Sequence, residues 1–275
     1  MRYSITSRFR GTLLGVTLGE KITQPRQYPQ IAKVIIPGAQ SLVELGRFER
    51  EYWLEKLPIS KLTPLQAIIA TLPLALFYHD NKIKLRQNLL LVGSIWENDL
   101  IIQESILALG YAIAQALTEE FTPYKLIPQI VTFIDAPSTD LIDKLIQVQT
   151  LLEQKAGVER TITQLNQNKS CLTTSIALAF YYFLSTAEDL KLSVKRSMLS
   201  PFTSSAIVGA LSGAYNSALS IPSSWQTIFV DTQTSAQTEM LQLSDYLVAV
   251  WSGMYNSEAK LTSTAVAAPR VIRSR

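Results

Sequence analysis

The sequence predicts an all-α fold, a compact single-domain bundle of about a dozen helices. Three observations support this prediction. Almost every long segment repeats its apolar residues with the 3.6-residue period of a helix. No two neighbouring segments combine alternating polarity with the turn residues of a β-hairpin. Residues 197–230 contain no charged side chain, although 17% of the chain is charged, which indicates burial in a large core.

Size and composition limit the class of protein. With 275 residues and 47% hydrophobic residues, the chain can bury one large core. We therefore expect one helical domain over residues 1–262 and a disordered basic tail over 263–275. The net charge of +3 is small and dispersed, so we expect no nucleic-acid partner. The single cysteine excludes an internal disulfide, and we expect a cytoplasmic protein.

The uncharged stretch does not have the composition of a membrane span. A spanning helix needs about 20 predominantly apolar residues. Here Ser and Thr are scattered throughout, and Pro201 and Pro222 interrupt the apolar run. We therefore expect no membrane span and interpret the stretch as a helix inside a soluble core.

Helical periodicity and the prolines together suggest where each element begins and ends. The expected helices cover 5–21, 41–57, 63–78 with a kink at Pro73, 84–96, 100–117, a short one from 123 to 137, 141–154, 171–184, 188–198, 203–218 and 235–254. Pro25, Pro29 and Pro37 predict an irregular connection over 22–37, with a short strand-like segment at 34–36.

Two helices carry stripes of small residues. In the first helix, Gly11, Gly15 and Gly19 share one face. Each glycine destabilises a helix by about 1 kcal/mol relative to alanine. Three glycines at this spacing therefore indicate that another group approaches this face closely. The helix at 203–218 has a similar face, formed by Ala206, Gly209, Ala210, Gly213 and Ala214. Close helix packing explains both stripes, and a backbone surface for a nucleotide-like ligand is the alternative.

The ends of the second striped helix are also predicted. Thr203 or a neighbouring serine is suited to cap its start. Ile221 precedes Pro222, and a residue before proline disfavours the helical region, so we expect the element to end there.

Three segments resemble the ADP-ribosylglycohydrolase family. RFRGTLLGVTLGE (Arg8–Glu20) resembles the family's opening helix, with its glycine at every fourth position. LPLALFYHD (Leu72–Asp80) is similar to the family's P-L-x-L-x-Y segment. Thr203–Trp225 resembles the closing motif, in which D-x-D-T precedes a Gly- and Ala-rich helix and I-P-x-x-W. The resemblance implies an all-helical domain around a paired magnesium or manganese site.

The sequence departs from the family pattern where the metals bind. The two aspartates of D-x-D-T align with Ser200 and Phe202, whereas Thr203 keeps the threonine. The family's T-D-D motif does not occur before Pro73. Only Glu20 remains as a carboxylate, so we expect no metal cofactor. The remnant cleft is predicted to include Gly19, Glu20, Ser200, Phe202 and Thr203.

These departures leave three functions open. The first is a catalytically inactive family member that acts as a binding or regulatory module, through a protein partner or a nucleotide-like ligand. The second is an active hydrolase that removes ADP-ribose with an atypical or single-metal site, held by Glu20 and an acid such as Asp80 or Asp99. The third is a structural or assembly partner in an oligomer, which includes a homo-oligomer.

Overall fold

The computed structural model describes residues 3–23, 30–57, 62–96, 99–118, 121–136, 139–167, 170–225 and 235–254. Every regular element in these ranges is a helix, which confirms the predicted fold class. The predicted tail at 263–275 lies outside the described residues.

The helices follow one another with short connections. In chain order they are α1 (Ile5–Thr23), α2 (Gln30–Leu45), α3 (Arg50–Lys56), α4 (Pro64–Ala70), α5 (Leu72–Phe77), α6 (Lys82–Gly93), the 3₁₀ turn η2 (Ser94–Trp96), α7 (Leu100–Ala116), α8 (Pro123–Ile134), α9 (Asp140–Glu153), α10 (Val158–Leu165), α11 (Cys171–Ser185), α12 (Leu190–Ser197), α13 (Ser205–Asn216), the 3₁₀ turn η3 (Ala218–Ser220) and α15 (Ser235–Ser252).

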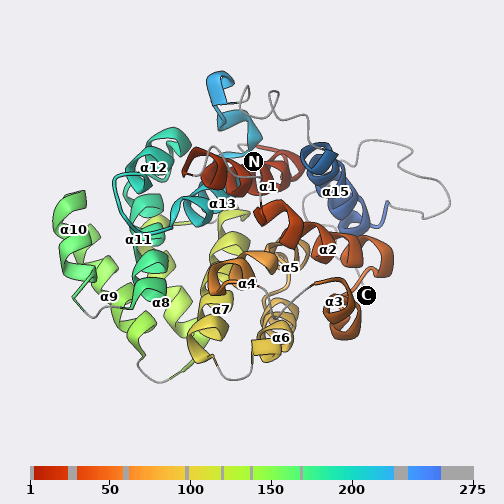
Figure 1. Cartoon of the computed structure of the whole chain (residues 1–275), viewed down its shortest axis with the longest axis horizontal. Coiled ribbons are helices and arrows are strands. Elements are labelled where there is room, and N and C mark those ends of the chain that lie inside the picture. Colours follow the sequence, from red (N-terminus) through yellow and green to blue (C-terminus); the bar gives the residue numbers. More distant parts are fainter. Residues whose placement is uncertain are drawn as a thin grey trace.

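The helices are arranged around a central pair. In Figure 1, α1 and α13 lie side by side, with α8 to α12 gathered at the left and α2, α3 and α15 at the right. Helix α7 runs through the middle and contacts α4, α5, α8 and α13. The first helix and one of the last therefore form the centre of the fold.

The two small-residue stripes face each other across the α1–α13 contact. A Cβ atom on Gly11 would lie 2.3 Å from the Gly213 carbonyl oxygen. A Cβ on Gly19, two turns further along α1, would lie 2.1 Å from the carbonyl oxygen of Ser205. The helices are thus antiparallel, and their backbones touch. This arrangement confirms the interpretation of the stripes as helix packing.

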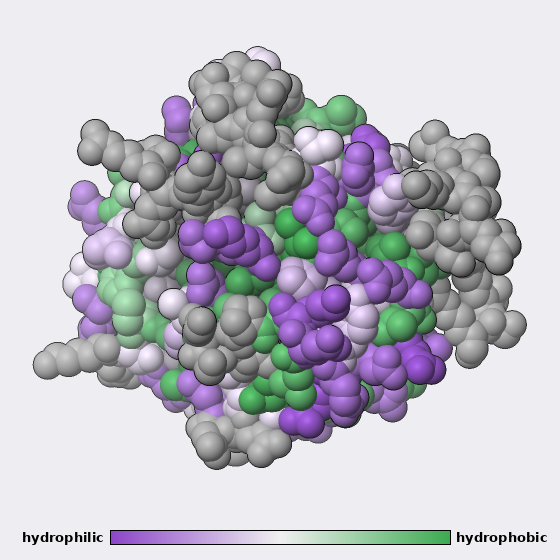
Figure 2. Space-filling view, turned by 45° about the vertical axis from the view of Figure 1, so that its right-hand side comes forward, coloured by the Kyte–Doolittle hydropathy of each residue, from purple (hydrophilic) through white to green (hydrophobic). Residues whose placement is uncertain are grey.

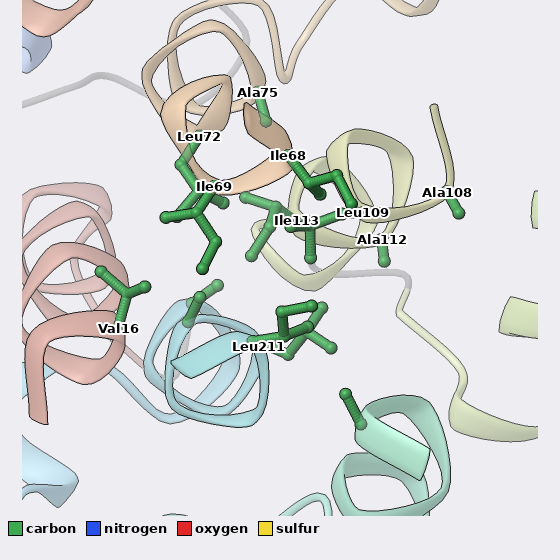
Figure 3. Packing of buried hydrophobic residues seen from close by; sticks show 14 of the residues in the cluster. Val16, Ile68, Ile69, Leu72, Ala75, Ala108, Leu109, Ala112, Ile113 and Leu211 are labelled. Carbon is green, nitrogen blue, oxygen red and sulfur yellow. The ribbon is translucent and has the colours of Figure 1, made fainter. Parts of the chain in front are cut away.

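The hydrophobic core forms beside this pair. Figure 3 shows side chains from α1, α4, α5, α7 and α13 pointing toward a common centre. The labelled residues are Val16, Ile68, Ile69, Leu72, Ala75, Ala108, Leu109, Ala112, Ile113 and Leu211. All are buried, so a single core joins the N-terminal and C-terminal parts of the chain.

The prediction for residues 22–57 is wrong in part. Residues 34–36 are helical, because α2 begins at Gln30 and continues through Pro37. A proline inside a helix costs about 3 kcal/mol. Burial of Ile31, Ile35 and Leu42 offsets this cost, since that face of α2 packs against α4, α5 and α15. The predicted helix over 41–57 is divided at Gly46, which has φ +64° and ends α2.

Two other predicted helices have different bounds in the structure, and one helix is additional. The helix expected at 63–78 is divided at Thr71 into α4 and α5, with Pro73 in the first turn of α5. Helix α13 ends at Asn216, before Ile221, because Ser217 takes φ +68°. The side-chain amide of Asn216 donates to the Ala187 carbonyl at 2.7 Å. Helix α10 was not expected.

Exposed hydrophobic side chains are dispersed over the surface. On the face shown in Figure 2, green hydrophobic residues lie between purple hydrophilic ones. The most exposed large hydrophobic side chains among the described residues, Ile83, Leu199 and Leu219, come from three different parts of the fold. Within the described helices, none has the length and apolarity that crossing a bilayer would require.

Candidate functional site

A cavity of about 470 Å³ lies where α1 ends and where α2, α4, α11 and α13 begin. We call it the helix-end cavity. Its lining consists of Glu20, Thr23, Gln30, Ile31, Thr63, Pro64, Leu65, Gln66, Cys171, Leu172, Ser175, Thr203 and Ala206. The lining is a mixture of hydroxyl, amide and apolar groups with one carboxylate.

That carboxylate, Glu20, is bound to the start of α2. Its Oε1 accepts hydrogen bonds from the backbone N–H of Gln30 at 2.9 Å and of Ile31 at 3.1 Å, and Oε2 lies 3.2 Å from the Ile31 nitrogen. The first N–H groups of a helix have no partner inside the helix, and negative charge near them is favourable. Glu20 therefore caps α2 from the neighbouring helix.

Burial also changes the acidity of Glu20. Partial removal from water raises the pKa of its carboxyl, and the hydrogen bonds from Ile31 and Gln30 and the nearby Lys21 charge offset only part of this effect. The carboxyl thus holds its proton more tightly than an exposed glutamate does.

The predicted cleft residues lie in two different environments. Glu20 and Thr203 both line the helix-end cavity. Gly19 packs instead against the α13 backbone at Ser205. Ser200 accepts a hydrogen bond from the Phe202 N–H at 3.1 Å, and the Phe202 ring packs against the core. Within the described part of the chain, Gly19, Ser200 and Phe202 do not line the cavity.

Several lining residues were not anticipated. Thr63 and Gln66 form a capping box at the start of α4, in which each side chain accepts from the other's backbone N–H. The spacing of Thr63, Pro64 and Gln66 signals a helix start in the sequence. Cys171 and Ser175 line the cavity from the first turns of α11. These helix starts lie together because of tertiary packing, which a local sequence pattern cannot predict.

The donor atoms in the cavity do not fit a paired metal site. Mg²⁺ prefers carboxylate and water oxygens in near-octahedral geometry. The lining offers one carboxylate, Glu20, and both of its oxygens already accept backbone hydrogen bonds. Among the described residues, no three His, Cys, Asp or Glu side chains are grouped as metal ligands would be.

Comparison with known proteins identifies the family. No curated protein matches the chain. The family model for ADP-ribosylglycohydrolase matches residues 37–256, which run from the middle of α2 to just beyond α15 and leave α1 outside. The match includes the segment around α5 and the α13 stripe, two of the three segments that carry the resemblance. Because the match extends over most of the chain, the protein belongs to the ADP-ribosylglycohydrolase family.

Proposed function

We propose that this protein is a catalytically inactive ADP-ribosylglycohydrolase-like protein that acts as a binding or regulatory module. The observation that supports this proposal is the engagement of Glu20 with the start of α2. Hydrolysis of an N-glycosidic bond needs an activated water and charge stabilisation at the departing group. A carboxylate that caps a helix is poorly placed to supply either.

The helix-end cavity is suited to binding without reaction. Its volume of about 470 Å³ lies in the range of small-molecule sites. The Thr63 and Thr203 hydroxyls and the Gln66 amide offer hydrogen bonds to a polar, uncharged surface such as ribose hydroxyls, whereas the Ser175 hydroxyl already donates to the Cys171 carbonyl at 2.7 Å. A nucleotide-like ligand is therefore the proposed occupant, and a protein partner would respond to its binding.

Two measurements test this proposal. The protein is incubated with an arginine-ADP-ribosylated protein and Mg²⁺ or Mn²⁺, and titrations by calorimetry follow binding of each metal and of ADP-ribose. We expect no release of ADP-ribose, no tight metal binding, and saturable binding of ADP-ribose that Thr203→Val weakens. Metal-dependent release of ADP-ribose would overturn the proposal of inactivity. Absence of any ADP-ribose binding would exclude ADP-ribose as the ligand and contradict the proposal of a nucleotide-like occupant.

An active hydrolase with an atypical or single-metal site is the second candidate. The raised pKa of Glu20 favours it, because a carboxyl that holds its proton near a cavity is a candidate general acid. If activity is found, Glu20→Gln should abolish it without unfolding the protein. Activity that survives this substitution would exclude Glu20 as the acid.

An assembly role is the third candidate, in which a partner would cover individual exposed leucines. Leu199 and Leu219 are 71% and 78% exposed. Burial of such side chains in an interface is favourable, at roughly 25 cal/mol per Å² of apolar surface. Sedimentation that shows an oligomer, dissociated by Leu199→Ser or Leu219→Ser, would support it. A monomer at all concentrations, with no partner recovered, would argue against it.

A further inference from the structure

A second cavity, of about 560 Å³, lies at the other end of α11. The helix-end cavity contacts α11 at Cys171, Leu172 and Ser175, whereas this one contacts it at Tyr181 and Leu184. A helix rises about 1.5 Å per residue, so Leu172 and Leu184 are about 18 Å apart along the axis. Residues of α8 to α12 line the cavity, and Figure 1 shows these helices at the left. We call it the Arg196 cavity, and it is separate from the site described above.

Two cationic side chains line the cavity, Lys155 and Arg196, and Arg196 lies in the last turn of α12. The guanidinium is half-buried, and its Nη1 donates to Ser185 Oγ at 3.2 Å. No carboxylate among the described residues pairs with it. A guanidinium presents its donors in a planar fork that matches a carboxylate, and this fork is held in place by Ser185.

The dipole of α12 does not by itself explain the presence of Arg196. Cations near a helix C-terminus are stabilising, and Lys195 provides one in the same turn of α12. Lys195 does not line the cavity, whereas Arg196 does. The guanidinium therefore adds a directed donor group to a cavity wall at a helix end that already has a cation.

A largely apolar surface faces this charge. Leu152, Val158, Leu184 and the ring of Tyr181 line the cavity. The Tyr181 hydroxyl donates to the Ala156 carbonyl at 2.5 Å, so this polar group is satisfied inside the protein. Tyr181 is 3% exposed and thus supports the wall from behind, whereas the half-buried Leu152, Val158 and Leu184 present its apolar surface.

The charges in the lining define what the cavity accepts. Lys155 and Arg196 are cationic, and Glu153 is anionic and accepts a hydrogen bond from the Gln149 amide at 2.7 Å. The balance is positive, so an anion is favoured over a cation.

We propose that the Arg196 cavity binds a small amphipathic carboxylate, whose charged group pairs with Arg196 and whose aryl or acyl body covers Leu152, Val158 and Leu184. The site lies outside the helix-end cavity and does not depend on the function proposed for it. Its ligand is held by one charged contact and by burial of apolar surface.

Gly157 makes the site testable without removing Arg196. It lines the cavity and occupies the N-cap position of α10 with φ −72° and ψ 165°, which any residue adopts. No atom lies within 4 Å of a Cβ built there, so a side chain enters open space. Asp and Asn both cap a helix well, so both variants should fold. Gly157→Asp adds a negative charge beside the cavity, and Gly157→Asn is its neutral match.

The experiment is a calorimetric titration of the full chain with benzoate, indole-3-acetate and octanoate, and with the corresponding neutral amides. We expect at least one carboxylate to bind saturably, with its amide at least tenfold weaker. Arg196→Gln should weaken carboxylate binding at least tenfold, whereas Lys195→Gln, with the same change in net charge, should leave it unchanged. Gly157→Asp should weaken binding more than Gly157→Asn does.

Three outcomes would overturn the proposal. The first is that no carboxylate of the set binds at millimolar concentration. The second is that acid and amide bind equally, which would make the charged contact irrelevant. The third is that Lys195→Gln weakens binding as much as Arg196→Gln, which would indicate attraction by general surface charge. Thermal unfolding of each variant verifies that it is folded.

Discussion

Gly15 and Gly209 each place a backbone carbonyl oxygen where the other residue's side chain would begin. A Cβ on Gly15 would lie 2.0 Å from the Gly209 oxygen, and a Cβ on Gly209 would lie 1.9 Å from the Gly15 oxygen. Both obstacles are backbone atoms, which cannot turn aside as a flexible side chain does. The contact between α1 and α13 thus depends on glycine at both positions.

We predict that Gly15→Ala and Gly209→Ala each lower the free energy of unfolding by about 3 kcal/mol or more, because the helices must separate. The matched control is Gly93→Ala in α6, where a Cβ would lie 3.5 Å from Gln103 Cγ, an ordinary contact. That variant should gain about 0.4–1 kcal/mol, since alanine restricts the unfolded chain. Urea unfolding measures all three, and equal effects would refute the steric explanation.

Glu20 is predicted to stabilise the protein as a helix cap. Glu20→Ala removes the acceptor for two backbone N–H groups and should cost about 1 kcal/mol. Glu20→Gln keeps a carbonyl oxygen that accepts the same bonds and avoids a partly desolvated charge, so it should cost less. Urea unfolding at pH 7 compares the two variants. An equal loss for both would show that the negative charge, and not the hydrogen-bond geometry, supports α2.

Stability should depend on pH through Glu104. This residue is 2% exposed, its Oε2 accepts from Thr139 Oγ1 at 2.7 Å, and its Oε1 has no partner among the described residues. Burial raises the pKa of Glu104, and the bond from Thr139 offsets part of the rise. Between the unfolded pKa of about 4.3 and the higher folded value, the native state binds more protons than the unfolded state. The free energy of unfolding should therefore fall as pH rises through this window.

Glu104→Gln should remove that dependence. Its stability, relative to the parent protein, should increase as pH rises from the unfolded pKa to the folded pKa of Glu104 and then stay constant, as measured by urea midpoints at each pH. Glu159→Gln, at an exposed position of α10, is the control for the same change in net charge. Parallel curves for Glu104→Gln and the parent would contradict the prediction.

Lys144 is predicted to hold α9 and α11 together. It is 3% exposed and donates to Thr173 Oγ1 at 2.8 Å and to Thr174 Oγ1 at 2.9 Å. The Lys144 Nζ also lies 3.2 Å from Oδ2 of Asp140, whose side chain is 31% exposed. Lys144→Met should cost about 2 kcal/mol, because the partner groups are left unpaired. A double-mutant cycle with Asp140→Asn should show strong coupling, and additive losses would disprove the shared network.

The sequence predicted most helices because their apolar faces are periodic and prolines mark several starts. Helix α2 was misjudged because Pro37 lies inside it and its cap, Glu20, comes from α1. A cap that arrives from another helix leaves no local signal. Helix α10 was missed because it is short and its N-cap residue, Gly157, has no side chain to signal a helix start.

The candidate site was predicted only in part, for a related reason. Glu20 and Thr203 could be placed because each belongs to a segment that resembles a family motif. Cys171 and Ser175 lie in a segment without such a resemblance, and only the packing of α11 brings them to the same cavity. The resemblance to family motifs identified the lining residues near the ends of α1 and α13, whereas those from α11 could be identified only from the structure.

The pairing of Gly11 with Gly213 has a consequence for how the chain is made. Helix α1 leaves the ribosome well before α13, because the other helices from α2 to α12 are made between them. Contacts so distant along the chain are slow to form, because a long loop must close before they are made. The nascent protein therefore carries α1 with one face uncovered until α13 has been made, and the contact between the two helices forms only then.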